Sequence, residues 1–385
     1  MRVLHIAAGN LYGGVETLLV TLARCRALCP AMEPEFALCF EGRLSSELRA
    51  AGVPVHMLGQ TRVRRPDSIW RARRRLSALL VGRAFDAAIC HMAWPQAIFA
   101  PVVRAAALPL AFWLHDATGG RHWLERWARR TRPDLALCNS RFTATGLDNL
   151  YPGVPSEIIY CPVAPGPPCG SGARAGLRAE LNTAADAAVI VQVSRLEEWK
   201  GHRLLLQALG RLREVPGWTC WIAGGAQRAH EARYLEKLKL LSSELGIGGR
   251  VRFLGQRSDV PRLLAAADIF CQPNSGPEPF GIAFIEALYA GLPVVSTAIG
   301  GALEIIDDTC GILVKAGDID GLARALGKLV EDTGARLQLA GCAPGRAHAL
   351  CEPAHQLARL AAALEQRFAP SAAPAEVPTR SVCAL

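Results

Sequence analysis

The strongest constraint on the fold of this chain is the alternation of short apolar runs with longer amphipathic patterns, in two series. Helical patterns such as Val15–Ala27 and Ile69–Leu80 stand between the apolar runs. This alternation is typical of βαβ units, in which helices cover both faces of a parallel sheet. The predicted strands are Val3–Ala8, Glu35–Cys39, Val55–Leu58, Ala87–His91, Leu110–His115, Leu135–Asn139 and Glu157–Tyr160, then Val189–Val193, Thr219–Ala223, Val251–Leu254, Ile269–Gln272, Pro293–Ser296 and Gly311–Val314.

A Pro-rich stretch from Cys161 to Pro168 separates the two series and predicts a linker. The length of 385 residues also favours two domains. We therefore predict an α/β fold of two Rossmann-like, doubly wound parallel-sheet domains, residues 1–165 and 166–349, facing each other across a cleft. A helix around 350–368 is predicted to pack back on the first domain, and the Pro/Ala-rich tail 369–385 to be disordered.

The composition limits what the protein can be. Hydrophobic residues make up 51% of the chain and charged residues 20%, which supports large cores, but no uninterrupted apolar run is long enough to span a membrane. The 13 cysteines are scattered without CxxC pairs, which favours reduced thiols in the cytoplasm over disulfides or a zinc site. The start of the chain is too short and polar for a signal peptide and predicts a buried strand.

Positive charge is concentrated in the first half. Residues 1–165 contain 20 arginines, no lysine and 12 acidic residues, a net charge of +8 out of +9 for the chain. Such a surface attracts anionic lipid or phosphorylated substrates, and an ordinary solvated face remains an alternative. No nucleic-acid-binding motif accompanies it, so we predict no nucleic-acid partner. The two clusters are Arg62, Arg64, Arg65, Arg71, Arg73, Arg74 and Arg75, and Arg121, Arg126, Arg129, Arg130 and Arg132.

Two glutamates eight positions apart, Glu278 and Glu286, are the main candidates for ligand binding. Pro279 suits a first helical turn, which places Glu278 just before a helix and Glu286 two turns into it. Eight helical residues rise ~12 Å, roughly the reach of a sugar diphosphate plus ribose. Free amides at the helix start would face phosphate between the two carboxylates.

Two cations follow the first strand of the second half. Arg195 and Lys200 lie in Ser194-Arg195-Leu196-Glu197-Glu198-Trp199-Lys200-Gly201. Fixed cations at the end of a strand would stabilise the charge that develops on a diphosphate leaving group. Taken by itself, this segment could instead be a surface loop with ordinary charges.

Two glycine pairs also follow strands. Gly13-Gly14 opens a helix and would let the backbone approach phosphate, although a plain tight turn is the alternative. The pair is not part of a GxGxxG dinucleotide fingerprint. Gly224-Gly225 could form a wall beside a nucleotide base.

Taken together, these residues resemble the retaining glycosyltransferases of family 4, which have the GT-B fold. Order and spacing agree over roughly residues 187–335. The resemblance rests on Ser194-Arg195-Leu196 with Lys200-Gly201, Ala223-Gly224-Gly225, Val251 to Gly255, Glu278-Pro279-Phe280-Gly281 with Glu286-Ala287, Gly291 to Val295, Gly300-Gly301 with Glu304, Gly311 to Val314, and Gly317-Asp318. The first half is similar more loosely, through Gly13-Gly14-Val15-Glu16, His115-Asp116 and Asn139-Ser140. Tyr160 to Val163 departs from the Asn-Gly-Val-Asp segment that the family often has before the linker.

The resemblance implies a role for each matching residue. Arg195 and Lys200 would bind the donor diphosphate, Glu286 the ribose and Glu278 the donor sugar. His115 would lie near sugar and acceptor, with a satisfied core histidine as the alternative, while Asp116 would orient neighbouring backbone. The implied catalytic residues are therefore His115, Glu278, Arg195 and Lys200. The implied donor-binding residues are Gly13, Gly14, Arg195, Lys200, Gly225, Leu254, Phe280, Gly281, Ile282 and Glu286.

The mechanism of retention can be a double displacement or a front-face reaction. No residue in the sequence can be assigned as the nucleophile that a double displacement needs, which favours the front-face account usual for the family. Asp318-Ile319-Asp320 looks like a metal-binding motif, but Asp318 is better placed to cap the next helix. We therefore predict no cofactor and no metal.

The leading hypothesis is transfer of sugar from a UDP- or GDP-sugar to a glycan or lipid-linked acceptor, in polysaccharide or glycolipid synthesis. A soluble-acceptor transferase, a sugar-nucleotide epimerase and a non-catalytic sugar-nucleotide-binding subunit remain alternatives. The expected location is the cytoplasm, with binding to anionic membrane at its inner face left open by the arginine clusters.

Overall fold

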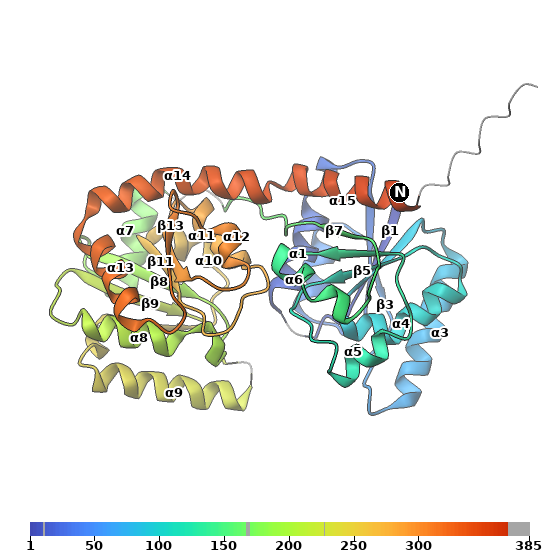
Figure 1. The fold of residues 1–385 in the computed structure, drawn as a ribbon, viewed down its shortest axis with the longest axis horizontal. Coiled ribbons are helices and arrows are strands. Elements are labelled where there is room, and N and C mark those ends of the chain that lie inside the picture. Colours follow the sequence, from blue (N-terminus) through green and yellow to red (C-terminus); the bar gives the residue numbers. More distant parts are fainter. Residues whose placement is uncertain (11, 167–169, 227, 369–385) are drawn as a thin grey trace, which may run out of the picture.

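The computed structural model of the chain describes residues 1–10, 12–166, 170–226 and 228–368. Its strands form two separate sheets in which neighbouring strands run parallel, with helices packed around each sheet (Figure 1). The first sheet has seven strands in the order β3-β2-β1-β4-β5-β6-β7, and the second has six in the order β10-β9-β8-β11-β12-β13. The predicted α/β fold of two doubly wound parallel sheets is therefore confirmed.

The element bounds follow the sequence pattern closely. The strands are β1 (Arg2–Ala7), β2 (Glu33–Leu38), β3 (Val55–Met57), β4 (Ala87–His91), β5 (Leu110–Leu114), β6 (Leu135–Cys138), β7 (Ser156–Ile158), β8 (Ala188–Val193), β9 (Trp218–Ala223), β10 (Val251–Gly255), β11 (Ile269–Gln272), β12 (Val294–Thr297) and β13 (Gly311–Val314). The α-helices are α1 (Gly14–Arg24), α2 (Arg43–Ala50), α3 (Pro66–Gly82), α4 (Ala93–Ala105), α5 (Trp123–Ala128), α6 (Arg141–Ala144), α7 (Ser171–Glu180), α8 (His202–Arg211), α9 (Ala229–Glu244), α10 (Val260–Ala266), α11 (Ile282–Tyr289), α12 (Ala302–Ile305), α13 (Ile319–Glu331), α14 (Thr333–Cys351) and α15 (Pro353–Phe368). The short 3₁₀ helices are η1 (Arg26–Leu28), η2 (Leu147–Asn149), η3 (Glu198–Lys200) and η4 (Gly248–Arg250).

The central strands are buried along their whole length and mostly apolar, because helices cover both faces of each sheet. All residues of β4, β5 and β9 are buried. A parallel strand covered on both faces has no solvent side and therefore lacks the polar alternation of a one-sided sheet. This is why short continuous apolar runs were sufficient to locate the strands.

Each sheet has one point at which its strand order reverses. The reversal lies between β1 and β4 in the first sheet and between β8 and β11 in the second. The chain leaves the two strands toward opposite faces there, which opens a crevice at their carboxyl ends where α/β proteins bind ligands. In the second domain the loops at this point are those beginning at Ser194 and Pro273, and they carry Lys200 and Glu278.

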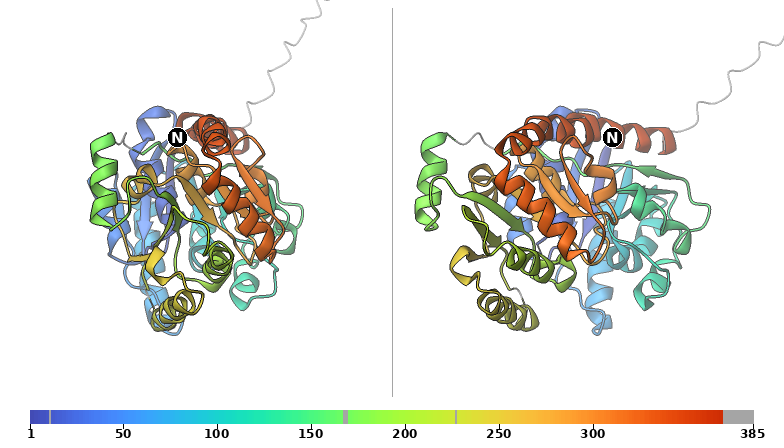
Figure 2. Two further views of the ribbon diagram at one scale, coloured as in Figure 1. Left: turned by 90° about the vertical axis from the view of Figure 1, so that its left-hand side faces the viewer. Right: turned by 60° about the vertical axis from the view of Figure 1, so that its left-hand side comes forward.

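The C-terminal helices connect the domains. α14 packs on α11 of the second domain, whereas α15 contacts α1 and η1 of the first. The red helices lie along one side of both domains in every view (Figures 1 and 2). Cys29 Sγ lies 3.8 Å from the Leu357 carbonyl oxygen, and Arg367 Nε donates to the Asp134 carbonyl at 3.0 Å.

Two sequence predictions concern residues outside the described ranges. The predicted disordered tail, 369–385, lies wholly outside them, and the predicted linker does so in part. Among the helices described, none combines the length and the apolar character that crossing a membrane requires.

Gly201 lies where the two loops at this point of the second sheet come into contact. It has φ +75°, and a Cβ added there would lie 1.8 Å from the Pro273 carbonyl oxygen. The loops are also joined by a hydrogen bond from Ser275 N to the Trp199 carbonyl at 2.8 Å. Glycine is therefore required both by the left-handed backbone and by the contact between the loops.

Gly201→Ala is expected to lower the free energy of unfolding by about 3 kcal/mol or more, because backbone must move to admit the methyl group. Gly217→Ala is the matched control, since Gly217 has the same φ of +75° with nothing near the added Cβ. The control should lose only about 1–2 kcal/mol, from the left-handed backbone alone. Urea unfolding of both variants measures the difference, and equal losses would contradict the close contact.

Candidate active site

A buried carboxylate stands at the centre of the second domain's crevice. Glu278 is 8% exposed, and its Oε2 accepts a hydrogen bond from Lys200 Nζ at 2.6 Å. The same oxygen accepts from Gln272 Nε2 at 3.0 Å and from Asn274 Nδ2 at 3.1 Å. A buried charge of this kind is tolerated because it is paired with a cation and accepts several hydrogen bonds. The structure thus brings together Glu278 and Lys200, two predicted site residues that are 78 positions apart.

Lys200 is held on a second side by an aromatic ring. Its Nζ lies 4.1 Å from the centroid of the Trp199 ring, within the range of a cation–π contact. An ammonium group carries three donors, and one of them is used by Glu278. Lys200 is therefore fixed in place with donor capacity left for an anionic ligand.

The helix that carries Glu286 starts later than the sequence prediction placed it. α11 begins at Ile282, so Pro279 lies outside the helix and Glu286 is little more than one turn inside it. Gly281 has φ +113°, which is not helical, and Glu278 pairs with Gly300 in an isolated parallel bridge. The predicted span of eight helical residues between the glutamates is therefore wrong, because residues 279–281 form a bend that ends in the left-handed Gly281 instead of a first helical turn.

The segment before α11 is packed against the first domain. Phe280 is buried and stacks on Tyr160, with ring centroids 5.5 Å apart. A Cβ on Gly281 would lie 2.4 Å from Phe284 Cδ2, so this position also needs glycine. The Phe280, Gly281 and Ile282 amides predicted to face a ligand therefore lie on a rigid, tightly packed turn.

Hydrogen bonds join the first domain to this segment and to the nearby helix α12. Ser140 Oγ donates to the Pro279 carbonyl at 2.6 Å. The Glu304 carboxylate accepts from Arg141 N at 2.9 Å and from Phe142 N at 2.8 Å, at the start of α6. It also accepts from the Tyr160 hydroxyl at 2.9 Å. The Glu278 segment is thus positioned by both domains.

The Gly13-Gly14 loop lies opposite two predicted site residues of the second domain. A Cβ added to Gly13 would be 4.0 Å from Arg195 Nε, and one added to Gly14 would be 3.7 Å from Ile282 Cδ1. Gly13 N donates to Glu16 Oε2 at 3.0 Å. Burial raises the pKa of Glu16, which hydrogen bonds and the charge of Arg195 counteract. The helix start predicted to approach phosphate is therefore beside the predicted diphosphate cation.

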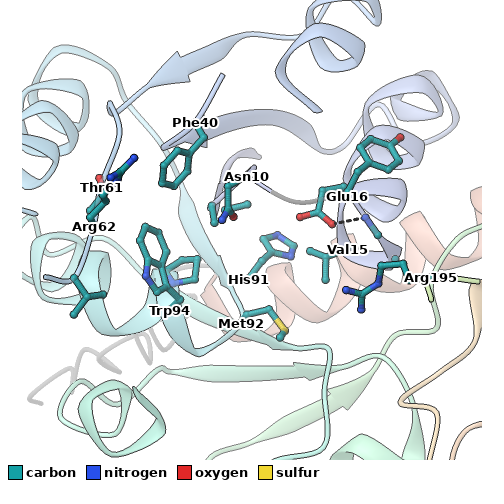
Figure 3. A pocket seen from close by; sticks show the side chains of 17 residues that line it. Asn10, Val15, Glu16, Phe40, Thr61, Arg62, His91, Met92, Trp94 and Arg195 are labelled. Carbon is teal, nitrogen blue, oxygen red and sulfur yellow. Dashed lines mark hydrogen bonds between the residues drawn. The ribbon is translucent and has the colours of Figure 1, made fainter. Parts of the chain in front are cut away.

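A cavity of about 660 Å³ occupies the crevice of the first domain, between the ends of β1 and β4. Arg62 and Arg195 lie on opposite sides of it, with Phe40, Asn10, His91 and Trp94 between them (Figure 3). Met92 borders the cavity and has φ +75°, an unusual conformation for a residue with a side chain. The cavity combines aromatic walls with charged ends.

A second cavity, of about 380 Å³, lies between the domains on the other side of Arg195. Glu286 and Gly225, two residues that the sequence analysis assigned to donor binding, line it together with Gln256, Arg257 and Ser258. Leu254 lies in β10 and does not line the cavity; the residues just after that strand do. Tyr12 and Arg195 border both cavities. Glu278 and Lys200 line neither of these two cavities.

His115 follows β5 and is buried, at 6% exposure. Its Nε2 is 2.9 Å from His91 Nδ1, and burial lowers the pKa of His115 to about 3. Asp116 accepts from Ala117 N at 2.8 Å, in agreement with the backbone role predicted for it. Burial raises the pKa of Asp116, and the nearby charges of Glu278, Glu125 and Glu197 add to the rise. This end of β5 therefore faces the loops of the second domain.

The Asp318-Ile319-Asp320 motif caps a helix. Asp318 is the N-cap of α13 and accepts from Gly321 N at 2.8 Å, as predicted. Across residues 1–10, 12–166, 170–226 and 228–368, no group of three His, Cys, Asp or Glu side chains could hold a metal ion.

The sequence analysis missed several residues of this site. Gln272 and Asn274 both bind Glu278, but Gln272 was only the end of a predicted strand and Asn274 was not singled out. Glu304, Ser140 and Tyr160 act between domains, so no local pattern marks them. Ser140 and Glu304 stood within the segments of the family resemblance, which was the available signal.

Comparisons with known proteins agree with this architecture. Residues 174–343 match the sequence model of the family described as glycosyl transferases group 1. The lipopolysaccharide core biosynthesis glycosyltransferase LpsE of Rhizobium meliloti (strain 1021) is 38% identical over 164 residues, 42% of this chain and 45% of that protein. The GDP-mannose-dependent alpha-(1-6)-phosphatidylinositol monomannoside mannosyltransferase of Mycolicibacterium smegmatis is 34% identical over 199 residues, 49% of this chain and 48% of that protein. These matches span about half the length of the curated relatives.

Solved structures are similar over nearly the whole chain. The crystal structure of Anabaena Alr3699/HepE in complex with UDP is 25% identical, with a TM-score of 0.82, and the alignment covers 95% of this chain and 100% of that chain. The structure of WaaG, a glycosyltransferase involved in lipopolysaccharide biosynthesis, has a TM-score of 0.70 at 18% identity and bears on the fold alone. The predicted GT-B fold is confirmed.

Glu286 should make stability depend on pH, because burial raises its pKa to about 7 from the ordinary 4.5. Between these values the folded protein holds a proton that the unfolded chain releases, so the free energy of unfolding should fall as pH rises from about 4.5 to 7. Glu286→Gln should remove that fall, on the order of 2 kcal/mol for a partly exposed side chain. Urea unfolding at pH 5 and 8 measures it.

The control for this measurement is the exposed Glu331→Gln, which should keep the pH dependence of the wild type. A Glu286→Gln variant with the same slope as the wild type would show that Glu286 titrates normally.

Proposed function

We propose that this protein is a retaining glycosyltransferase of family 4, which transfers a sugar from a nucleoside-diphosphate sugar to a glycan acceptor. The observation that carries the proposal is the buried Lys200–Glu278 pair, at 2.6 Å, which joins the loops after β8 and β11. Arg195 lies on the first of these loops, beside Gly13 at the start of α1. This arrangement offers fixed cations and helix-start amides to a diphosphate, and a carboxylate to sugar hydroxyls.

The donor is proposed to lie along the line from the second cavity to Glu278. Glu286 in that cavity binds the ribose, while Gly225 and Gln256 to Ser258 surround the base. Arg195, which borders both cavities, then meets the diphosphate together with Lys200 and the Gly13-Gly14 loop. Two similar proteins support a nucleotide-sugar donor: one was solved in complex with UDP, and the other is described as GDP-mannose-dependent.

Retention is proposed to follow the front-face route. The oxygen of the departing diphosphate takes the proton of the acceptor hydroxyl on the same face of the sugar, as the bond to the anomeric carbon breaks. Lys200 and Arg195 stabilise the charge on the leaving diphosphate, and Glu278 and His115 position the sugar. This route needs no protein nucleophile, consistent with a Glu278 oxygen already engaged by three donors.

The acceptor is proposed to enter the 660 Å³ cavity of the first domain, whose Trp94 and Phe40 suit the apolar faces of sugar rings. Thr61, Arg62 and Val63 border this cavity and directly precede α3. The exposed arginines of α3 and its preceding loop therefore adjoin the cavity. A lipid-linked acceptor at an anionic membrane surface would be presented beside its binding site.

Lys200→Ala and Glu278→Gln are each expected to lower turnover roughly 100-fold or more, because both remove charge stabilisation or sugar positioning in the transition state. The assay follows nucleotide release from UDP-glucose and GDP-mannose, after thermal-shift screening has shown which donor stabilises the protein.

The matched controls are Lys239→Ala and Glu236→Gln, which disrupt an exposed pair at 2.8 Å on α9. These should leave turnover unchanged. Near-normal turnover in the folded Lys200→Ala and Glu278→Gln variants would refute the assigned roles.

Membrane binding depends, in this proposal, on the exposed arginines near the cavity. Arg73 and Arg75 are excluded from the test because they donate to the carbonyls of Ile98 and Leu58 and so support the fold. Replacing the exposed arginines by glutamine should lower co-sedimentation with vesicles containing anionic lipid, roughly tenfold or more. The test set is Arg64, Arg65, Arg71 and Arg74.

A charge-matched variant of the second domain separates this surface from net charge. It should bind the same vesicles as the wild type does, and equal loss in both variants would sink the assignment of the surface. The control set is Arg211, Arg213, Arg233 and Arg324, all exposed.

A further inference from the structure

Three histidines form one hydrogen-bonded chain across the first sheet. His5 Nδ1 is 3.0 Å from His91 Nε2, and His91 Nδ1 is 2.9 Å from His115 Nε2. The residues come from three neighbouring strands, β1, β4 and the end of β5. Their rings also stack in sequence, with centroids 5.2 Å apart at both steps. The three hydrogen-bonded histidines run from the core to His115, and His91 also lines the 660 Å³ cavity of the first domain.

Burial keeps all three rings neutral. His5 and His91 are 0% and 1% exposed, and His115 is 6% exposed. Desolvation lowers the pKa of His5 to about 3. Desolvation also lowers the pKa of His91 well below its ordinary value, and the neighbouring His115 and His5 add to this effect. Each ring therefore carries one proton, on one of its two nitrogens.

The two hydrogen bonds make the tautomers of the three histidines depend on one another. His91 uses both nitrogens, so it donates with one and accepts with the other. If His5 donates to His91, His91 must donate to His115 Nε2, and all three rings are protonated at Nδ1. If the order is reversed, all three are protonated at Nε2.

The environment of His5, at the other end of the three histidines, distinguishes the two protonation patterns. His5 Nε2 is buried and has no hydrogen-bond partner among the described residues. The Nε2-protonated order would leave an N–H donor orphaned there, whereas the Nδ1-protonated order leaves only a lone pair. Orphaned buried N–H groups are the rarer defect in proteins, as known for backbone groups.

We propose that His91 is a positioning residue that holds His115 in the Nδ1–H tautomer. No described residue bonds to His115 Nδ1 in the structure. His115 then presents a neutral N–H donor, rather than a proton acceptor or a cation, to an oxygen of the bound sugar or acceptor. This inference about substrate contact rests on the proposed function, whereas the tautomer itself does not.

The test is nitrogen-15 NMR of the histidine rings, in wild-type protein and in two variants of His91. Asn at this position has an amide nitrogen near the place of Nδ1 and can still donate to His115, whereas Leu cannot. Wild type and His91→Asn should show His115 protonated at Nδ1, and His91→Leu should lose that preference. His56→Asn, a histidine outside the chain that bonds to Glu35, is the control and should leave His115 unchanged.

Turnover provides the second readout. His91→Leu should lower kcat about tenfold, the rate equivalent of one neutral hydrogen bond, and His91→Asn should restore most of it. An Nε2–H tautomer of His115 in the wild type, or an unchanged tautomer in a folded His91→Leu variant, would overturn the proposal. These NMR outcomes are read without any donor, so they are independent of whether the protein transfers sugar.

Discussion

The rest of the site depends on one buried ion pair, between Lys200 and Glu278. Each residue lies on the loop that follows one of the two strands at the point where strand order reverses, β8 and β11. A carboxylate that is 8% exposed is stable only with its partners in place, so Gln272, Asn274 and Lys200 must converge on it. The close approach of Gly201 to Pro273 also keeps these groups together, because a larger residue at position 201 would push the two loops apart.

The two domains contribute unequal chemistry to the cleft. The second domain supplies Arg195 and the Lys200–Glu278 pair. The first supplies a helix that starts after glycine, aromatic walls and three neutral, hydrogen-bonded histidines. Their relative position is set by contacts to the same short segment: Ser140 bonds to Pro279, and Tyr160 stacks on Phe280. The Glu304 carboxylate further binds the free amides at the start of α6, which is a favourable place for an anion.

A neutral histidine is consistent with the proposed front-face reaction. In that reaction the leaving diphosphate takes the acceptor proton, so the protein needs no strong base near the sugar. The fixed charges of Arg195 and Lys200 then carry the electrostatic part of the work, in a site whose other groups are desolvated. The raised pKa values of Glu16, Asp116 and Glu286 reflect the same low-dielectric surroundings.

The sequence by itself determined the strands, the fold class and much of the candidate site. Buried parallel strands read as apolar runs, so all thirteen predicted strands are present with ends within two residues. Arg195, Lys200 and the Gly13-Gly14 loop were marked by residue type after predicted strands, and Glu278 by its place just before a predicted helix. The sequence misplaced the start of α11, because Pro279 is compatible with a first helical turn. In the fold, Glu278 pairs with Gly300 and Gly281 adopts a left-handed conformation before the helix begins.

Only the tertiary structure decided which groups touch. Glu278 is bound by Lys200 from 78 residues away, Glu304 meets the start of α6 across the domain boundary, and His5, His91 and His115 meet across three strands. Such pairs leave no local periodicity in the sequence, because they arise from the order of strands in a sheet and from the docking of two domains. The chemical types were therefore readable from the sequence, whereas their protonation and their partners depend on burial and distance, which the fold alone creates.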